Sequence, residues 1–136
     1  MRSRARLYDL YAQREFARVA GLGRAMTQVI SELADAKASA ARLQRMSQET
    51  QVANGPLLAA TLRARGLLTS ELVEEADRQN HRVEHAQQEA ERLRQAMTLH
   101  DRRRLFGQTA ATNARAADAE AAEARAEAAR PTQTRR

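Results

Sequence analysis

A regular alternation of apolar and polar positions runs through the first part of the chain. Apolar residues recur at spacings of three and four, which is the a/d pattern of a coiled coil. Every position of this series is apolar: Val19, Leu22, Met26, Val29, Leu33, Ala36, Ala40 and Leu43. The pattern predicts a first helix over about residues 4–53.

An earlier apolar stripe precedes this series. Leu7, Leu10 and Tyr11 are out of phase with it, and Gly21 and Gly23 lie near the join. A change of phase in a heptad pattern locally unwinds or overwinds a coiled coil. We therefore expect a stutter or a soft spot there, within a helix that still runs through.

The strongest break in the pattern is Asn54-Gly55-Pro56. Asn or Gly can end one helix and Pro can open the next at its first turn, so 54–56 is predicted to be a turn between two helices. After it, a second series runs from Leu58 to Met97 in steps of four and three. Nine of its twelve positions are apolar, the exceptions being Arg65, Thr69 and Gln79.

The start of the second helix is left open between two positions. It can begin at Pro56, or at Ser70 after a break over 66–70, because Ser70 is followed by Glu71, Glu74 and Glu75. A serine cap and early acidic residues favour a helix start. The helix is expected to continue to about residue 129.

The C-terminal part is rich in alanine. Half of the residues from Gln108 to Arg130 are Ala, which favours helix but offers little surface to bury. A frayed helical extension is therefore predicted, followed by a disordered tail at 131–136. The fold class is all-α: one domain over 1–130, a long two-helix antiparallel coiled-coil hairpin.

Composition supports this fold class. Leu, Ile, Val and Phe together supply 22 of 136 residues, too few for a conventional globular core, whereas Ala, Glu, Lys, Leu and Arg supply 79. Five Gly, two Pro and few β-branched residues argue against all-β and α/β folds. The chain has no Cys, no secretory signal pattern and no uncharged stretch suited to a bilayer, so a soluble, cytoplasmic protein is expected.

The net charge of +6 is unevenly spread. Folding the chain back near residue 55 is expected to bring two arginine groups together at the open end, here called the basic foot: Arg2, Arg4, Arg6, Arg102, Arg103 and Arg104. The other end carries the leucine head: Leu57, Leu58, Leu62, Leu67 and Leu68. Both are candidate partner surfaces. The alternative is that the leucines close a local knob and the arginines are simply solvated.

One motif suggests chemistry. His81-Arg82-Val83-Glu84-His85 matches the H-x-x-E-H string of inverted zinc metallopeptidases. Such a site needs a third ligand and a cleft, which a two-helix fold does not supply, and Val83 is a predicted core position that turns both histidines outward. No phosphate-binding loop is present, and no catalytic, cofactor-binding or metal-binding residues are assigned. We expect no enzymatic activity.

The order of features over residues 5–130 resembles the FliJ-type flagellar export stalk proteins of bacterial type III secretion. The likeness lies in Leu7-x-x-Leu10, the turn at Asn54-Gly55, the segment from Leu72 and Gln79 to Val83 and Gln87, the block Leu99-His-Asp-Arg-Arg-Arg-Leu105, and the Ala/Glu/Arg-rich tail. The resemblance implies a coiled coil similar to the central stalk of rotary ATPases. It also implies three partners: the export ATPase hexamer, an export-gate membrane protein and export chaperones. The protein would then lie at the inner face of the cell membrane through these partners.

Two other functions stay open. Because 22 Arg give a pI near 11, a basic coiled coil that binds nucleic acid is the second choice. A generic coiled-coil scaffold or chaperone that oligomerises through the leucine head is another. A membrane-surface helix ranks below nucleic acid, because the apolar series is mostly Ala and small aliphatic residues. No small-molecule substrate and no cofactor are expected.

Overall fold

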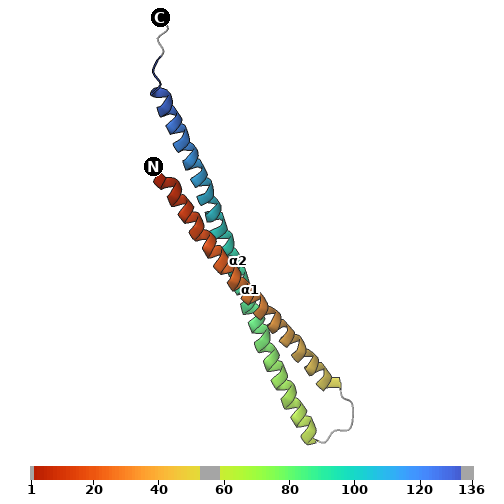
Figure 1. Cartoon of the computed structure of the whole chain (residues 1–136). Helices are drawn as coiled ribbons and strands as arrows, with labels where there is room; N and C mark the ends of the chain where they lie inside the picture. The colour runs from red at the N-terminus through yellow and green to blue at the C-terminus, as the bar shows by residue number, and fades with distance from the viewer. Residues whose placement is uncertain (1, 53–58, 133–136) are drawn as a thin grey trace. The chain divides into compact units, whose positions relative to one another are not determined.

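The computed structural model describes residues 2–52 and 59–132 and contains two α-helices. α1 spans Arg2–Val52 and α2 spans Ala59–Ala128 (Figure 1). The described residues contain no strand, and the predicted all-α fold of two mutually packed helices is confirmed. α2 is unbroken through 66–70 and includes the alanine-rich segment up to Ala128. The predicted turn at 54–56 lies outside the described residues.

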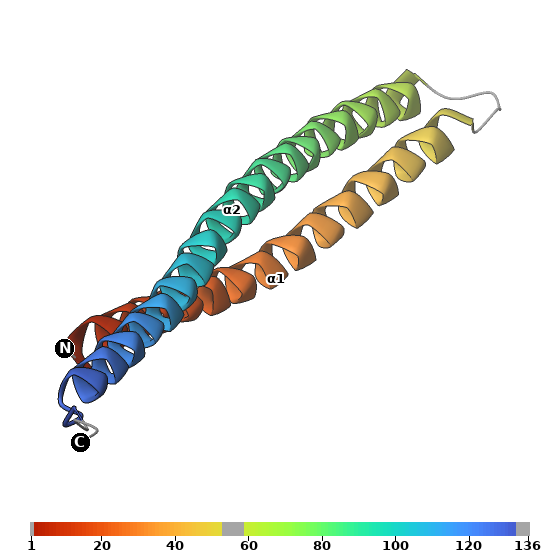
Figure 2. The same cartoon turned by 90° about the horizontal axis from the view of Figure 1, so that it is seen from above.

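The helices form two compact units. Unit 1 consists of residues 1–22 and 96–136, and unit 2 of residues 23–95. In each unit a segment of α1 lies beside a segment of α2 (Figure 2). The contacts in unit 1 pair low numbers with high ones, Asp9 with Arg115 and Glu15 with His100, so the two helices run antiparallel.

The predicted heptad series of α1 faces α2. All eight positions from Val19 to Leu43 are buried or half-buried, with Ala36 at 1% exposure. In α2 the positions of the series from Arg65 to Met97 are likewise buried or half-buried, whereas Leu62, its first described position, is 54% exposed; Leu72 and Leu93 are its largest buried members. The core of unit 2 is therefore the seam that the alternating spacing predicts.

The helix runs through Gly21 and Gly23 as expected, but the change of phase expected there is wrong. The series continues back from Val19 in the same phase, through Glu15, Ala12, Tyr8 and Ala5, all buried or half-buried. Leu7 and Leu10, which suggested a different phase, are 63% and 52% exposed. In unit 1 the buried residues of the seam include Ala5, Ala12 and Ala111, while the large apolar residues Leu7, Leu10 and Phe106 lie outside it.

Small residues are required here because the helices approach closely. A Cβ at Gly107 would lie 3.0 Å from Tyr11 Cδ1, 3.1 Å from Ala12 Cβ and 3.2 Å from the Tyr8 carbonyl oxygen. The Ala12 Cβ and the Tyr8 carbonyl oxygen are held by the backbone, so they cannot rotate away. Ala111, the next position of the seam in α2, is fully buried.

Two glycines of α2 should respond oppositely to the same substitution. Gly107→Ala is expected to lower the free energy of unfolding by about 1 kcal/mol, because crowding outweighs the gain in helix propensity. A Cβ at Gly66 would meet nothing within 4 Å, so Gly66→Ala should raise the free energy of unfolding by about 0.5–1 kcal/mol. Thermal melts followed by circular dichroism measure both, and equal stabilisation by the two changes would contradict close packing at Gly107.

Candidate interaction surfaces

A buried polar pair lies in the seam of unit 1. Glu15 is 2% exposed, and its carboxylate accepts hydrogen bonds from His100 Nδ1 and, at 3.2 Å, from Arg18 Nη1. The hydrogen bond with His100 is the main cause that lowers the pKa of Glu15; burial opposes it, and the positive charges of Arg18 and Arg103 lower the pKa further. The carboxylate is thus held ionised between the two helices.

Sequence reasoning missed this pair, although a signal was present. Continuing the α1 series back from Val19 reaches Glu15, and continuing the α2 series beyond Met97 reaches His100. An acid and a histidine at core positions of facing helices can pair across the seam. A second ion pair, between Asp9 and Arg115, also joins the two helices of unit 1.

The arginines of the predicted basic foot all belong to unit 1, but they are not gathered at one place. The side chain of Arg2 lies outside the described residues, and Arg4, Arg6, Arg102 and Arg103 are exposed. Because Glu15 pairs with His100 and the helices are antiparallel, the run 102–104 lies level with about residues 11–13 of α1. Arg4 and Arg6 precede that part of α1 by roughly 10 Å along the helix. Arg104 is half-buried and its Nε donates to Asp101 at 2.9 Å.

The two units differ in net charge. Unit 1 contains 13 basic and 7 acidic residues, whereas unit 2 contains 10 of each. The whole excess of positive charge therefore resides in unit 1. An anionic partner is attracted to unit 1, while unit 2 offers no net charge.

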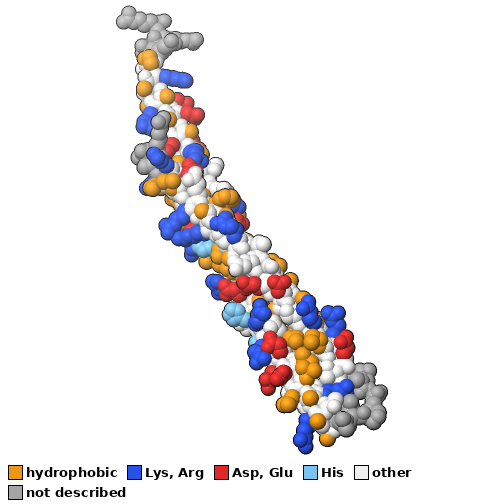
Figure 3. Space-filling model, turned by 60° about the horizontal axis from the view of Figure 1, so that its bottom comes forward, with side chains coloured by type: hydrophobic (Ala, Val, Ile, Leu, Met, Phe, Trp, Pro, Cys, Tyr) orange, Lys and Arg blue, Asp and Glu red, His pale blue; other side chains and the backbone are white. Residues whose placement is uncertain are grey.

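The described part of the leucine head is exposed. Leu62, Leu67 and Leu68 are 54%, 69% and 47% exposed, and Leu57 and Leu58 lie outside the described residues. Leu62 lines a groove of about 580 Å³ together with Gly66 and Val73. Leu67 and Leu68 do not line it, so the three described leucines do not form one face. Figure 3 shows hydrophobic side chains at the surface among charged ones.

A second groove of about 590 Å³ lies between the helices of unit 2. Its walls include core residues such as Leu43, Leu72 and Val83, and its rim carries Lys37 and Asp77. The groove is therefore lined by both apolar and polar side chains.

The histidines of the H-x-x-E-H string lie on the surface of α2. His81 and His85 are exposed, and His81 Nδ1 lies 3.8 Å from Glu84 Oε2, which pairs the central acid with one of the two histidines. In the described part of the chain no three His, Cys, Asp or Glu residues are grouped so that they could hold a metal ion.

Comparisons with known proteins yield no relative. No family model matches the chain, and neither a curated protein nor a solved structure matches it. Among the described residues, neither helix has a segment with the length and apolar character needed to cross a bilayer.

Proposed function

We propose that this protein is a non-enzymatic stalk or adaptor of the bacterial flagellar (type III) protein export apparatus. The observation that carries the proposal is the division of charge: a unit with 13 basic and 7 acidic residues is joined to a charge-balanced unit with exposed leucines. The antiparallel pairing of two long helices and the FliJ-like order of sequence features support it.

The proposed partner of unit 1 is the export ATPase hexamer. Complementary charge accelerates and orients the encounter of two proteins, and the effect weakens as salt is added. A ring lined by acidic side chains would be attracted to unit 1 in this way. The chain would then act mechanically or allosterically on the ring, with its own residues performing no chemistry.

The proposed partners of unit 2 are the export-gate membrane protein and export chaperones. Exposed leucines are suited to apolar contacts that salt does not weaken. Through these partners the protein would be held at the inner face of the cell membrane.

Removing the central arginines should slow docking to the ATPase ring. The triple variant Arg102→Ser, Arg103→Ser, Arg104→Ser is expected to lower the association rate constant about tenfold at low salt. Stopped-flow binding at two salt concentrations measures this. The matched control replaces three exposed arginines of unit 2, Arg42, Arg45 and Arg63, by Ser. An unchanged, salt-insensitive association rate in the first variant would reject the proposed docking.

Nucleic acid is the second candidate partner, because the excess positive charge of unit 1 also suits phosphates. A pulldown from host lysate with the full chain, with and without nuclease and at two salt concentrations, distinguishes the two. Recovery of the export ATPase or the export gate after nuclease treatment supports the export function. Loss of all partners on nuclease treatment supports nucleic-acid binding instead.

A further inference from the structure

The two helices of unit 1 present different side chains on the two sides of their seam. In the heptad pattern, positions g and c lie on one side of the a/d core and positions e and b on the other. The g/c side is here called the arginine-aromatic face. It contains Arg4, Leu7, Tyr11, Arg14 and Arg18 from α1, and Leu99, Arg103 and Phe106 from α2.

Contacts in unit 1 confirm that these residues share one side. The ring of Tyr11 lies over Gly107, the neighbour of Phe106 in α2. Arg18 of α1 donates a hydrogen bond to the carboxylate of Glu15, and the positive charge of Arg103 of α2 lowers the pKa of the same carboxylate. The ion pair between Asp9 and Arg115 joins two e positions and so marks the opposite side.

Large apolar side chains on this face point to solvent. Leu7 and Phe106 are each 63% exposed, and Leu99 is 48% exposed. None of them occupies a position of the seam. Exposed apolar residues that come together in this way are typical of a surface that binds a partner.

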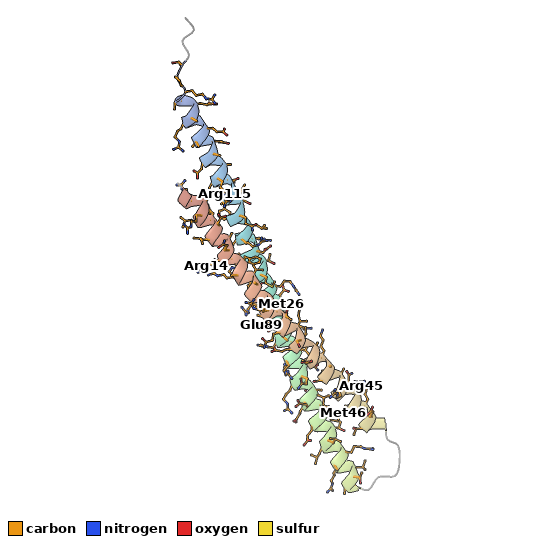
Figure 4. All side chains as sticks on the ribbon, in the orientation of Figure 1. Arg14, Met26, Arg45, Met46, Glu89 and Arg115 are labelled. Atoms are coloured by element: carbon orange, nitrogen blue, oxygen red, sulfur yellow. The ribbon has the colours of Figure 1, made fainter. Side chains whose placement is uncertain are left out.

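The same face carries four arginines, Arg4, Arg14, Arg18 and Arg103, and one carboxylate beside them, that of Glu15, to which Arg18 donates at 3.2 Å. In the stretches 4–18 and 99–113 the carboxylates are Asp9, Glu15 and Asp101. Glu15 is buried in the seam, while Asp9 and Asp101 occupy e positions and pair with Arg115 and Arg104. Figure 4 shows Arg14 on α1 and Arg115 on α2. The arginine-aromatic face is therefore both cationic and apolar.

We propose that the arginine-aromatic face binds the surface of a bilayer containing anionic phospholipids. Leu7, Leu99 and Phe106 enter the boundary between headgroups and acyl chains, and the arginines bind lipid phosphates. Each basic residue near such a surface contributes about 1 kcal/mol. The apolar side chains favour a bilayer over nucleic acid, since phosphate binding alone makes no use of exposed leucines. This inference does not depend on the proposed export function.

The sequence-based ranking of a membrane surface rested on the residues of the seam. Those residues face the partner helix and are unavailable to lipid. The side chains proposed to meet the bilayer are a different set. They occupy heptad positions on the outside of unit 1.

The test is co-sedimentation of the full chain with vesicles of phosphatidylcholine alone or mixed with phosphatidylglycerol. The double variant Leu99→Ser, Phe106→Ser is expected to bind the mixed vesicles about tenfold more weakly. The matched control is Phe16→Ser, Leu105→Ser, which removes the same residue types with exposures of 62% and 49% from the e/b side. It should bind as the unchanged chain does. Circular dichroism checks that both variants stay helical.

One double variant tests the arginines, and a DNA duplex separates lipid from nucleic acid. Arg14→Ser with Arg103→Ser should weaken binding to the mixed vesicles and make it less sensitive to salt, with little change on phosphatidylcholine alone. Equal vesicle binding by the two apolar double variants would overturn the proposal. So would tight binding to a DNA duplex together with no sedimentation on mixed vesicles, which would assign the face to nucleic acid.

Discussion

Replacing Leu93 by alanine is expected to lower the free energy of unfolding by about 3 kcal/mol. Leu93 is 3% exposed and lies in a seam where most other buried residues are alanines. Because few large side chains fill this core, each one accounts for a large share of the buried apolar area, and the space it leaves has no long neighbour to close it.

Urea denaturation followed by circular dichroism measures the loss at Leu93. The control is Leu67→Ala in the same unit, since Leu67 is 69% exposed and its truncation should change stability by less than about 0.5 kcal/mol. Equal losses from the two substitutions would mean that burial in the seam does not determine the stability of unit 2.

The second large effect on stability is expected from replacing Glu15 by alanine. The substitution removes the anion that His100, Arg18 and Arg103 surround, and leaves Arg18 and Arg103 without the carboxylate that they share. The thermal midpoint is expected to fall by several degrees. Replacing Glu15 and His100 together by leucine should recover most of the loss, because an apolar pair needs no partner in the core.

The pH dependence tests the same pair. The pKa of Glu15 is lowered in the folded chain, so its contribution to stability is fully present above the pKa of an unfolded glutamate, about 4.3, and is lost as the pH falls through the folded value. Glu15→Ala should therefore lose less stability than the unchanged chain on acidification below about pH 4. The exposed Glu120 provides a control, since Glu120→Ala should leave the acid profile unchanged. Identical acid profiles for the unchanged chain and Glu15→Ala would show that this carboxylate is not stabilised by its neighbours.

The seam of unit 2 was predictable because its residues are apolar and spaced at three and four. The seam of unit 1 was predictable only in part: it includes Val19 and Leu22 of the predicted series, but hydrophobicity alone does not identify Glu15, His100 or Gly107 as core positions. These residues are buried through a specific pairing and a close approach of two backbones. Leu7 and Leu10 led to the wrong expectation of a change of phase for a related reason. They are apolar, but they lie outside the contact between the helices.

The candidate surfaces were predictable in composition but not in placement. Counting charges identifies the arginines at 2–6 and 102–104, but only the register between the helices shows which residues are level. The pairing of Glu15 with His100 moves the second group away from the first. The arginine-aromatic face depends on heptad positions that become known only when the seam of unit 1 is known.

The buried carboxylate also limits how the two helices can align. A slip of one heptad would keep the spacing of three and four on both helices, but it would change which side chains meet in unit 1. Such a slip would place Leu93 or Gly107, in place of His100, opposite Glu15, and the charge would be buried without its partner. The ionised side chain of Glu15 and the close approach at Gly107 thus both favour one alignment of the two helices.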